Sequence, residues 1–228
     1  MEELFNIAIE ENMESQFAQI ANKLMNEYDL VVDNVKFQLL DIEFYLKNNV
    51  HNDKYVHGNE RQKKAYEWYL HRKSEDANGA INKGTRKGLD FTFGNVTTYG
   101  GILIRAIRNK EDLSLSEGPS LTVDRIKNIL EVEDVEELSK LIEGKNHKET
   151  KIYFEKKEKP SHYFIYFGKR HGLTSKTDPQ YYDKNYRFVV IDSNTNGIKD
   201  KTALLKNALS VRSLEDIRKD VGYNINLD

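Results

Sequence analysis

The sequence predicts a single domain of the α+β class. Its 228 residues are enough for one sizeable hydrophobic core. Apolar residues recur at helical spacing near the N-terminus, and several later segments are short, rich in β-branched and aromatic residues, and bounded by polar turns. We therefore expect N-terminal helices packed on a mostly antiparallel sheet, with residues 1–228 as one unit.

The first 46 residues combine a helical region with a buried strand. The run 37–46 (FQLLDIEFYL) has apolar residues on both faces of a strand, so we expect it to be buried on both sides. It carries Asp41 and Glu43 into the interior or a cleft, where a carboxylate needs compensating partners. Apolar positions at three-to-four spacing predict one or two amphipathic helices before it, at Leu4, Ile7, Phe17, Ile20, Ala21, Leu24 and Met25.

The middle of the chain predicts a helix followed by a hairpin. The polar segment Glu60–Arg72 is interpreted as helical and precedes the turn-rich NGAINKGTRKG. The runs FTFG and YGGILIRAI, joined by the polar NVTT, predict a β-hairpin.

The second half predicts further helices and strands. Gly118-Pro119-Ser120 marks a helix start, with Ser120 as the cap of a helix that ends at Leu130. The remaining predicted elements are an acidic helix at Val135–Ile142, strands at Tyr163–Phe167 and Tyr186–Ile191, and a short helix at Ser210–Val221.

Composition excludes several classes of site. The chain has no cysteine, which removes a disulfide scaffold, a thiolate zinc site, an iron–sulfur cluster and a cysteine nucleophile. The acidic start MEELFNIAIEENMESQF lacks the pattern of a secretion signal, and no long apolar window is present. We expect a soluble intracellular protein without a membrane partner, cytoplasmic and nucleoid-associated if the source is prokaryotic.

Charge is segregated along the chain although the formal net charge is only −2. Residues 61–110 hold eleven Lys and Arg against four acids, and residues 151–190 hold nine against four. Once folded, the two basic segments could form one positive face for a polyanion. Solvated surface scatter explains the same charges equally well.

Glu43 stands out as a candidate general base. Its neighbours Ile42, Phe44 and Tyr45 would desolvate the carboxylate, which suits it to accept a proton. A purely structural pairing of Glu43 with an arginine is the alternative at this point.

Five short motifs follow one another along the chain. They are E-F-Y-L at Glu43–Leu46 followed by D-x-x-x-H at Asp53–His57, I-L-I-R at Ile102–Arg105, Gly118-Pro119-Ser120, the segment Gly168–Leu173, and Y-R-F at Tyr186–Phe188. In these motifs and their order, about residues 37–191 resemble the methylpurine-DNA glycosylase family, also called alkyladenine or 3-methyladenine DNA glycosylases.

The resemblance implies a function and a site. Glu43 would activate the water that attacks the anomeric carbon of a flipped-out nucleotide, and Arg105 would help to hold that water and carboxylate. Tyr45 and His57 would form aromatic walls around the base. It also implies a curved sheet whose hairpin protrudes into DNA, and it requires no metal or cofactor.

Two positions depart from the family pattern. Phe93 stands where the family has an intercalating tyrosine, and Asp90 stands where a third aromatic wall is expected. An acid next to the base favours a ligand that donates hydrogen bonds, so the identity of the base stays open.

Basic residues on two segments are candidates for contacts with DNA phosphates. Lys83, Arg86 and Lys87 lie in a glycine-rich loop before the hairpin, for which an ordinary solvated turn is the alternative. Lys169 and Arg170 would form the second half of the same groove.

The sequence-based hypothesis is a monofunctional DNA glycosylase that acts as a monomer on double-stranded DNA containing a modified base. The alternatives are a catalytically silent nucleic-acid-binding module with a retained pocket, and a glycosylase for a modified base in foreign DNA or for a nucleoside. The spacing of His51, Asp53 and His57 permits a metal site, but three such side chains on a loop are more typical of polar surface.

Overall fold

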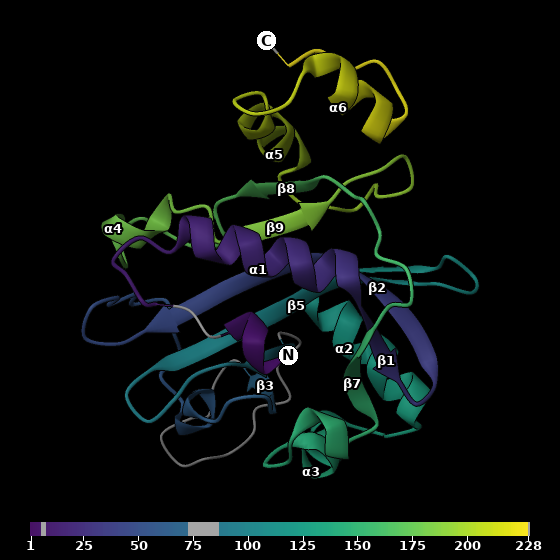
Figure 1. The fold of residues 1–228 in the computed structure, drawn as a ribbon. Coiled ribbons are helices and arrows are strands. Elements are labelled where there is room, and N and C mark those ends of the chain that lie inside the picture. Colours follow the sequence, from purple (N-terminus) through teal and green to yellow (C-terminus); the bar gives the residue numbers. More distant parts are fainter. Residues whose placement is uncertain (6–7, 73–86, 228) are drawn as a thin grey trace.

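The computed structural model describes residues 1–5, 8–72 and 87–227 (Figure 1). Nine strands in these ranges form one sheet in which all pairings are antiparallel. The strands are β1 (Tyr28–Val32), β2 (Val35–Lys47), β3 (Trp68–Arg72), β4 (Lys87–Thr92), β5 (Tyr99–Asn109), β6 (Leu115–Glu117), β7 (Ile152–Lys156), β8 (Ile165–Gly168) and β9 (Arg187–Val190). The helices are α1 (Glu14–Glu27), α2 (Pro119–Leu130), α3 (Val135–Ile142), α4 (Pro179–Tyr182), α5 (Lys201–Ala208) and α6 (Leu214–Val221). The predicted α+β class is confirmed.

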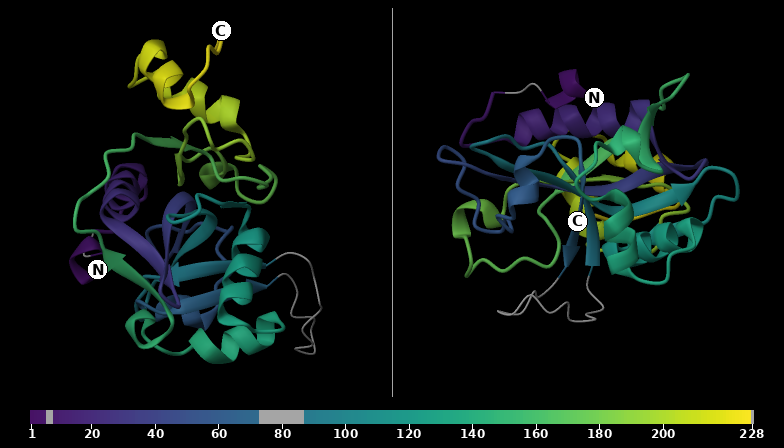
Figure 2. Two further views of the ribbon diagram at one scale, coloured as in Figure 1. Left: turned by 90° about the vertical axis from the view of Figure 1, so that its right-hand side faces the viewer. Right: turned by 90° about the horizontal axis from the view of Figure 1, so that it is seen from below.

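Strand β2 is the centre of the sheet. Strand β5 pairs along one edge of β2 over nearly its whole length. The other edge is shared, because β1 pairs with Val35–Phe37 and β9 pairs with Asp41–Glu43. The sheet therefore forks at β2 and curls, as Figure 2 shows from two further directions.

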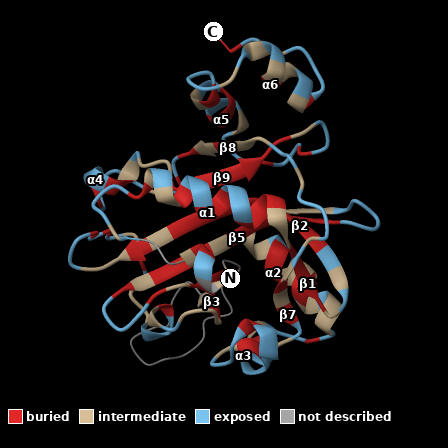
Figure 3. Ribbon diagram, viewed as in Figure 1, coloured by how far each residue is buried: buried red, intermediate tan, exposed pale blue. Residues whose placement is uncertain are grey.

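Helix α1 covers one face of β2 (Figure 1). Its apolar residues are buried, and the Phe17 ring stacks on Phe44 of β2 with centroids 4.4 Å apart. Figure 3 shows that the strands beneath α1 are almost entirely buried, so the core lies between this helix and the sheet. The predicted burial of β2 on both faces is confirmed.

The hairpin of β4 and β5 is also confirmed. Asn95 and Thr98 exchange two backbone hydrogen bonds of 3.0 Å, which close the turn. Gly94 is required at its base, since a Cβ there would lie 2.0 Å from the Gln62 carbonyl oxygen and 2.3 Å from that of Thr98.

The predicted helix at Glu60–Arg72 is wrong. Only a 3-10 turn forms at Glu60–Lys63, closed by a capping box between Asn59 and Gln62. The chain then becomes β3, because Trp68 and Leu70 are buried on one face and the Trp68 indole donates a 2.6 Å hydrogen bond to the Ile152 carbonyl. Tertiary burial thus overrides the local preference for a helix.

The predicted start of α3 is confirmed, whereas the predicted cap of α2 is wrong. Helix α3 has the predicted bounds, with Asp134 as its N-cap. The N-cap of α2 is Gly118 with φ 136°, not Ser120, which lies inside the first turn. The Ser120 hydroxyl instead exchanges 3.2 Å hydrogen bonds with the backbone of Lys87 and ties α2 to β4.

The C-terminal helices lie beyond β8 and β9 (Figures 1 and 2). Helix α6 begins at Leu214 after the Ser213 cap, slightly later than predicted, and α5 was not predicted. Within the described ranges, no helix is long and apolar enough to cross a membrane.

Candidate active site

The alternation of strand side chains divides the sheet into two faces. On β2, Ile42 and Phe44 face α1, whereas Asp41, Glu43 and Tyr45 point to the opposite face. A row of directly paired residues crosses four strands on that opposite face: Glu43 of β2, Leu103 of β5, Asp90 of β4 and Tyr69 of β3.

Glu43 is completely buried and surrounded by donors. Its Oε1 accepts a 2.7 Å hydrogen bond from the backbone N–H of His171 and lies 3.3 Å from Arg105 Nη1. Its Oε2 accepts a 2.8 Å hydrogen bond from the Tyr45 hydroxyl. Burial of a carboxylate is tolerated here because these groups replace its hydration.

Two carboxylates and two guanidinium groups form the centre of the site. Arg187 binds Asp41 through Nε and Nη2 at 3.0 and 2.8 Å, and Arg105 Nε donates to Asp41 at 3.3 Å. Burial disfavours the charge of Arg105, but Glu43 and Asp41 outweigh it and raise the pKa of this guanidinium above its ordinary value. Two carboxylates thus face two guanidinium groups, so the formal charges of the cluster balance.

Tyr45 does not form a wall of the cleft, contrary to expectation. Its hydroxyl is bonded to Glu43, and its ring lies 4.6 Å from the Arg170 guanidinium. Burial and the neighbouring Glu43 charge raise the pKa of Tyr45 well above its ordinary value, so the phenol keeps its proton and acts as a donor. The residue positions Glu43 because side chains two apart on a strand share a face.

Arg170 is not a DNA contact, contrary to expectation. Its side chain is fully buried and forms a 2.6 Å ion pair with Asp53, which is also fully buried. It donates a further hydrogen bond of 3.1 Å to the Phe44 carbonyl. The Asp53–Arg170 pair thus ties the loop after β2 to the segment after β8.

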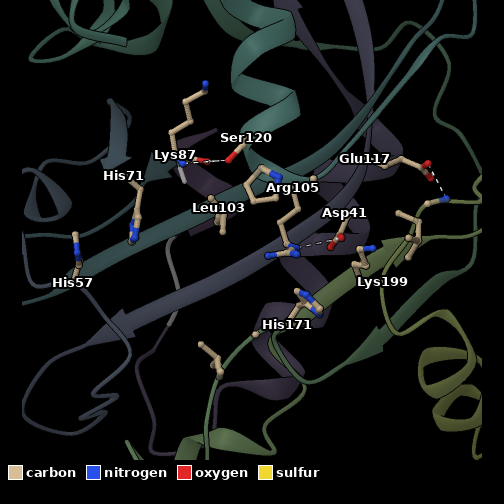
Figure 4. Close-up of a pocket in the computed structure, with 17 residues that line it drawn as sticks. Asp41, His57, His71, Lys87, Leu103, Arg105, Glu117, Ser120, His171 and Lys199 are labelled. Carbon is tan, nitrogen blue, oxygen red and sulfur yellow. Dashed lines mark hydrogen bonds and ion pairs between the residues drawn. The ribbon is translucent and has the colours of Figure 1, made fainter. Parts of the chain in front are cut away.

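A cleft of about 740 Å³ opens on this face of the sheet (Figure 4). Arg105 and His171 line it and contact Glu43, which is buried and does not line the cleft itself. Its charged and titratable lining residues are Asp41, His57, His71, Lys87, Arg105, Glu117, His171 and Lys199. Glycines, Leu103, Pro119 and other small or apolar residues complete the wall.

His171 and Asp200 form a pair that the sequence analysis missed. Their side chains meet at 2.6 Å between Nδ1 and Oδ2, and Asp200 lies 3.3 Å from Arg187 Nη1. Burial opposes the charge of Asp200, but His171 and Arg187 outweigh it, and the pKa of this carboxyl is lowered. The motif at Gly168–Leu173 includes His171, but nothing in the sequence indicates its partner.

His57 lies at the other end of the cleft and faces His71. The two rings stack with centroids 4.2 Å apart, and His57 Nδ1 is 2.9 Å from the Tyr69 hydroxyl. Asp90 is buried behind them, 3.7 Å from His71 Nδ1, and it does not line the cleft itself. His57, which was predicted as an aromatic wall, therefore lines the cleft together with the imidazole of His71. Asp90 contacts His71 and does not reach the cleft directly.

Phe93 is partly buried and packs against the core, so it is not placed as the predicted intercalating residue. Its ring stacks on Phe5 at 5.3 Å and lies 6.1 Å from Phe44. Asn95, Val96 and Thr97 are exposed at the turn, and Val96 has 88% of its surface accessible. Phe93 points inward because it follows the buried strand β4 on the side that faces α1.

The predicted phosphate contacts are placed as follows. Lys83 and Arg86 lie outside the described residues. Lys87 borders the cleft, but its ammonium forms a 2.6 Å ion pair with Asp124 and points away from the centre of the cleft (Figure 4). Lys169 is exposed near Tyr182, and Lys199, which was not predicted, is exposed at the cleft.

No metal cluster accompanies these groups in the described ranges, where no three His, Cys, Asp or Glu side chains are arranged to hold an ion. His51, Asp53 and His57 do not converge. His51 Nδ1 lies 3.1 Å from the Glu10 carbonyl, Asp53 binds Arg170, and His57 faces His71.

Comparison with known proteins identifies a viral relative. No protein-family model matches the chain. A protein of Acanthamoeba polyphaga mimivirus, described as "Uncharacterized protein L759", is 33% identical over 209 residues. The similarity covers 85% of this chain and 93% of the viral protein.

Proposed function

We propose that this chain, which belongs to the same family as protein L759 of the mimivirus, is a DNA glycosylase that hydrolyses the N-glycosidic bond of a modified base and leaves an abasic site. One observation carries the proposal: a fully buried glutamate, Glu43, lies directly behind a cleft and is held by Arg105, Tyr45 and the backbone of His171.

This arrangement suits hydrolysis at a sugar carbon. Breaking an N-glycosidic bond develops positive charge on the sugar ring, which a nearby carboxylate stabilises. Glu43 Oε2 accepts one hydrogen bond, from Tyr45, and an oxygen of this kind can accept a second from a water molecule. Glu43 would then take a proton from that water as it attacks the anomeric carbon.

The proposal requires access from the cleft to Glu43. Arg105 contacts the carboxylate through its side chain and His171 through its backbone N–H, and both residues line the cleft. The Arg105 side chain would therefore turn aside when the nucleotide enters. We propose double-stranded DNA as the partner, bound by a monomer, with Lys169 and Lys199 as phosphate contacts on the exposed surface.

The test is base release from duplex oligonucleotides that each contain one modified base, with abasic sites detected by alkaline cleavage. Glu43→Gln removes the proton acceptor and should slow release about 10²–10⁴-fold while DNA affinity changes little. Glu155→Gln is the matched control, because Glu155 is a strand glutamate on β7 that pairs with Lys36 at the surface.

The possible outcomes distinguish three hypotheses: Glu43 as the base, the His171–Asp200 pair as the base, and a binding module without activity. Full activity of Glu43→Gln removes Glu43 from the mechanism, and loss of activity in His171→Gln alone would transfer the role of base to the His171–Asp200 pair. Tight binding of the parent protein to modified DNA without release of any base would favour a silent binding module.

A further inference from the structure

Lys199 places an amine in the wall of the cleft, at the end where Arg105 and His171 lie (Figure 4). The residue is exposed, and among the described residues no carboxylate lies within ion-pair distance of its ammonium. Lys87, the other lysine of the lining, is by contrast paired with Asp124 at 2.6 Å. The glycosylase proposal uses Lys199 only as a phosphate contact, and its amine is available for chemistry of its own.

The backbone that carries Lys199 is fixed on both sides. The Gly197 N–H donates a 2.8 Å hydrogen bond to Glu117 Oε2, and a Cβ at Gly197 would lie 2.3 Å from the same oxygen. The Lys199 carbonyl accepts a 3.1 Å hydrogen bond from Arg187 Nη2. Arg187 is fully buried and also binds Asp41 in the centre of the site. Lys199 is therefore held beside the central cluster by its backbone, while its side chain takes no part in holding the fold.

The next residue, Asp200, orients a base beside this amine. It has a left-handed backbone with φ 58°, which is uncommon for a residue other than glycine. Its carboxylate lies 2.6 Å from His171 Nδ1 and 3.3 Å from Arg187 Nη1. In the neutral imidazole, a proton on Nδ1 is donated to Asp200, and the lone pair of Nε2 is left to accept a proton. His171 lines the cleft, so the cleft holds an amine and a proton acceptor together.

Building on the glycosylase proposal, which supplies the abasic site, we propose that the protein also cleaves the DNA strand there as a lyase, with Lys199 as the nucleophile and His171 as the base. The neutral amine of Lys199 adds to C1′ of the ring-opened sugar aldehyde, and water leaves as a protonated Schiff base forms. His171 Nε2 takes a proton from C2′, the electrons of that C–H bond form a C2′–C3′ double bond, and the C3′–O bond breaks so that the phosphate leaves with its electron pair. Water hydrolyses the Schiff base, which restores Lys199 and releases an unsaturated aldehyde on one strand fragment. Proton exchange with solvent restores His171.

The arrangement of the site meets the main geometric demand of this reaction. Nucleophile and base must reach C1′ and C2′, which are adjacent carbons of one sugar. Lys199 and His171 line the same cleft, and Asp200 joins them because it follows Lys199 in the chain and binds His171. The backbone N–H of His171 also donates a 2.7 Å hydrogen bond to Glu43. A sugar whose C1′ has been attacked next to Glu43 is therefore already beside the groups that the second reaction needs.

The test uses a duplex with a pre-formed abasic site, incubated without alkali, in the presence or absence of sodium borohydride. The parent should cleave the strand, and borohydride should trap a covalent protein–DNA adduct that peptide mapping assigns to Lys199. Lys199→Arg keeps the positive charge but has no nucleophilic amine, so trapping and cleavage should both fall by about 100-fold. His171→Gln should keep trapping within about threefold and lower cleavage by about 100-fold. Lys140→Arg, at an exposed lysine of α3 outside the cleft, is the control and should match the parent.

The contrary results are equally specific. Absence of an adduct with the parent, an adduct that maps to another amine, or parental trapping by Lys199→Arg overturns the lyase proposal. Parental cleavage by His171→Gln removes the role of base from His171. Because the abasic site is supplied in advance, the two proposals fail separately. Base release from modified duplexes without trapping leaves a glycosylase that is not a lyase, whereas trapping without base release from any modified duplex refutes the glycosylase proposal alone.

Discussion

Removing the buried charge of Arg170 should destabilise the fold strongly. Arg170→Met keeps most of the side-chain volume but deletes the 2.6 Å ion pair with Asp53 and the 3.1 Å hydrogen bond to the Phe44 carbonyl. Among the described residues, the carboxylate of Asp53 then accepts one hydrogen bond, of 2.9 Å from the Tyr55 backbone N–H, and it stays buried. An unpaired buried charge of this kind costs about 3–5 kcal/mol.

The loss should be measured in two ways. Urea unfolding followed by circular dichroism gives the free energy of unfolding, and a chain of this length should lose about 2–4 °C of Tm for each kcal/mol. We therefore expect Arg170→Met to lower Tm by about 6–20 °C. The matched control is Lys140→Met, which breaks the exposed pair of Lys140 with Glu136 and should leave Tm nearly unchanged.

A double variant isolates the cause. Asp53→Asn combined with Arg170→Met removes both charges, so it should be clearly more stable than Arg170→Met alone. A loss below about 1 kcal/mol in Arg170→Met would refute the reasoning. So would a double variant as unstable as the sum of the single changes, because the damage would then come from packing and not from the stranded charge.

Two further predictions test the placement of single side chains. Phe93→Ala should lower the free energy of unfolding by about 2–4 kcal/mol because it opens a cavity beside Phe5. Val96→Ala at the exposed turn is the control and should have little effect on stability. Equal stability of the two variants would contradict the packing of Phe93 against the core. Burial, together with the charge of Lys148, lowers the pKa of His147 to about 4, below its ordinary value of 6.5. The unfolded chain therefore binds the proton more readily than the folded protein does. The free energy of unfolding should fall by about 3 kcal/mol as the pH drops from 6.5 to 4. His147→Gln should reduce this slope in urea titrations at several pH values, and an unchanged slope would assign it to other groups.

The sequence by itself determined the elements whose signal is local. Apolar spacing located α1, an apolar run on both faces located β2, and turn residues located the hairpin of β4 and β5 and the segment Gly118-Pro119-Ser120 at which α2 begins. The same run identified Glu43 as a buried acid. The order of the motifs placed Arg105 near it, and the structure has Arg105 Nη1 3.3 Å from Glu43 Oε1. These inferences succeed because periodicity and turn chemistry depend on residues only a few positions apart.

Only the tertiary structure decided which side chains meet across the fold. Glu60–Arg72 has the composition of a helix, but its second half is a strand because Trp68 and Leu70 are buried against distant segments. His171 meets Asp200, and Arg170 turns inward to Asp53, through contacts between residues 29 and 117 positions apart. Such pairings depend on strand register and on the free-energy cost of leaving a buried charge unpaired. Both depend on residues far apart in the sequence, so neighbouring residues do not predict them.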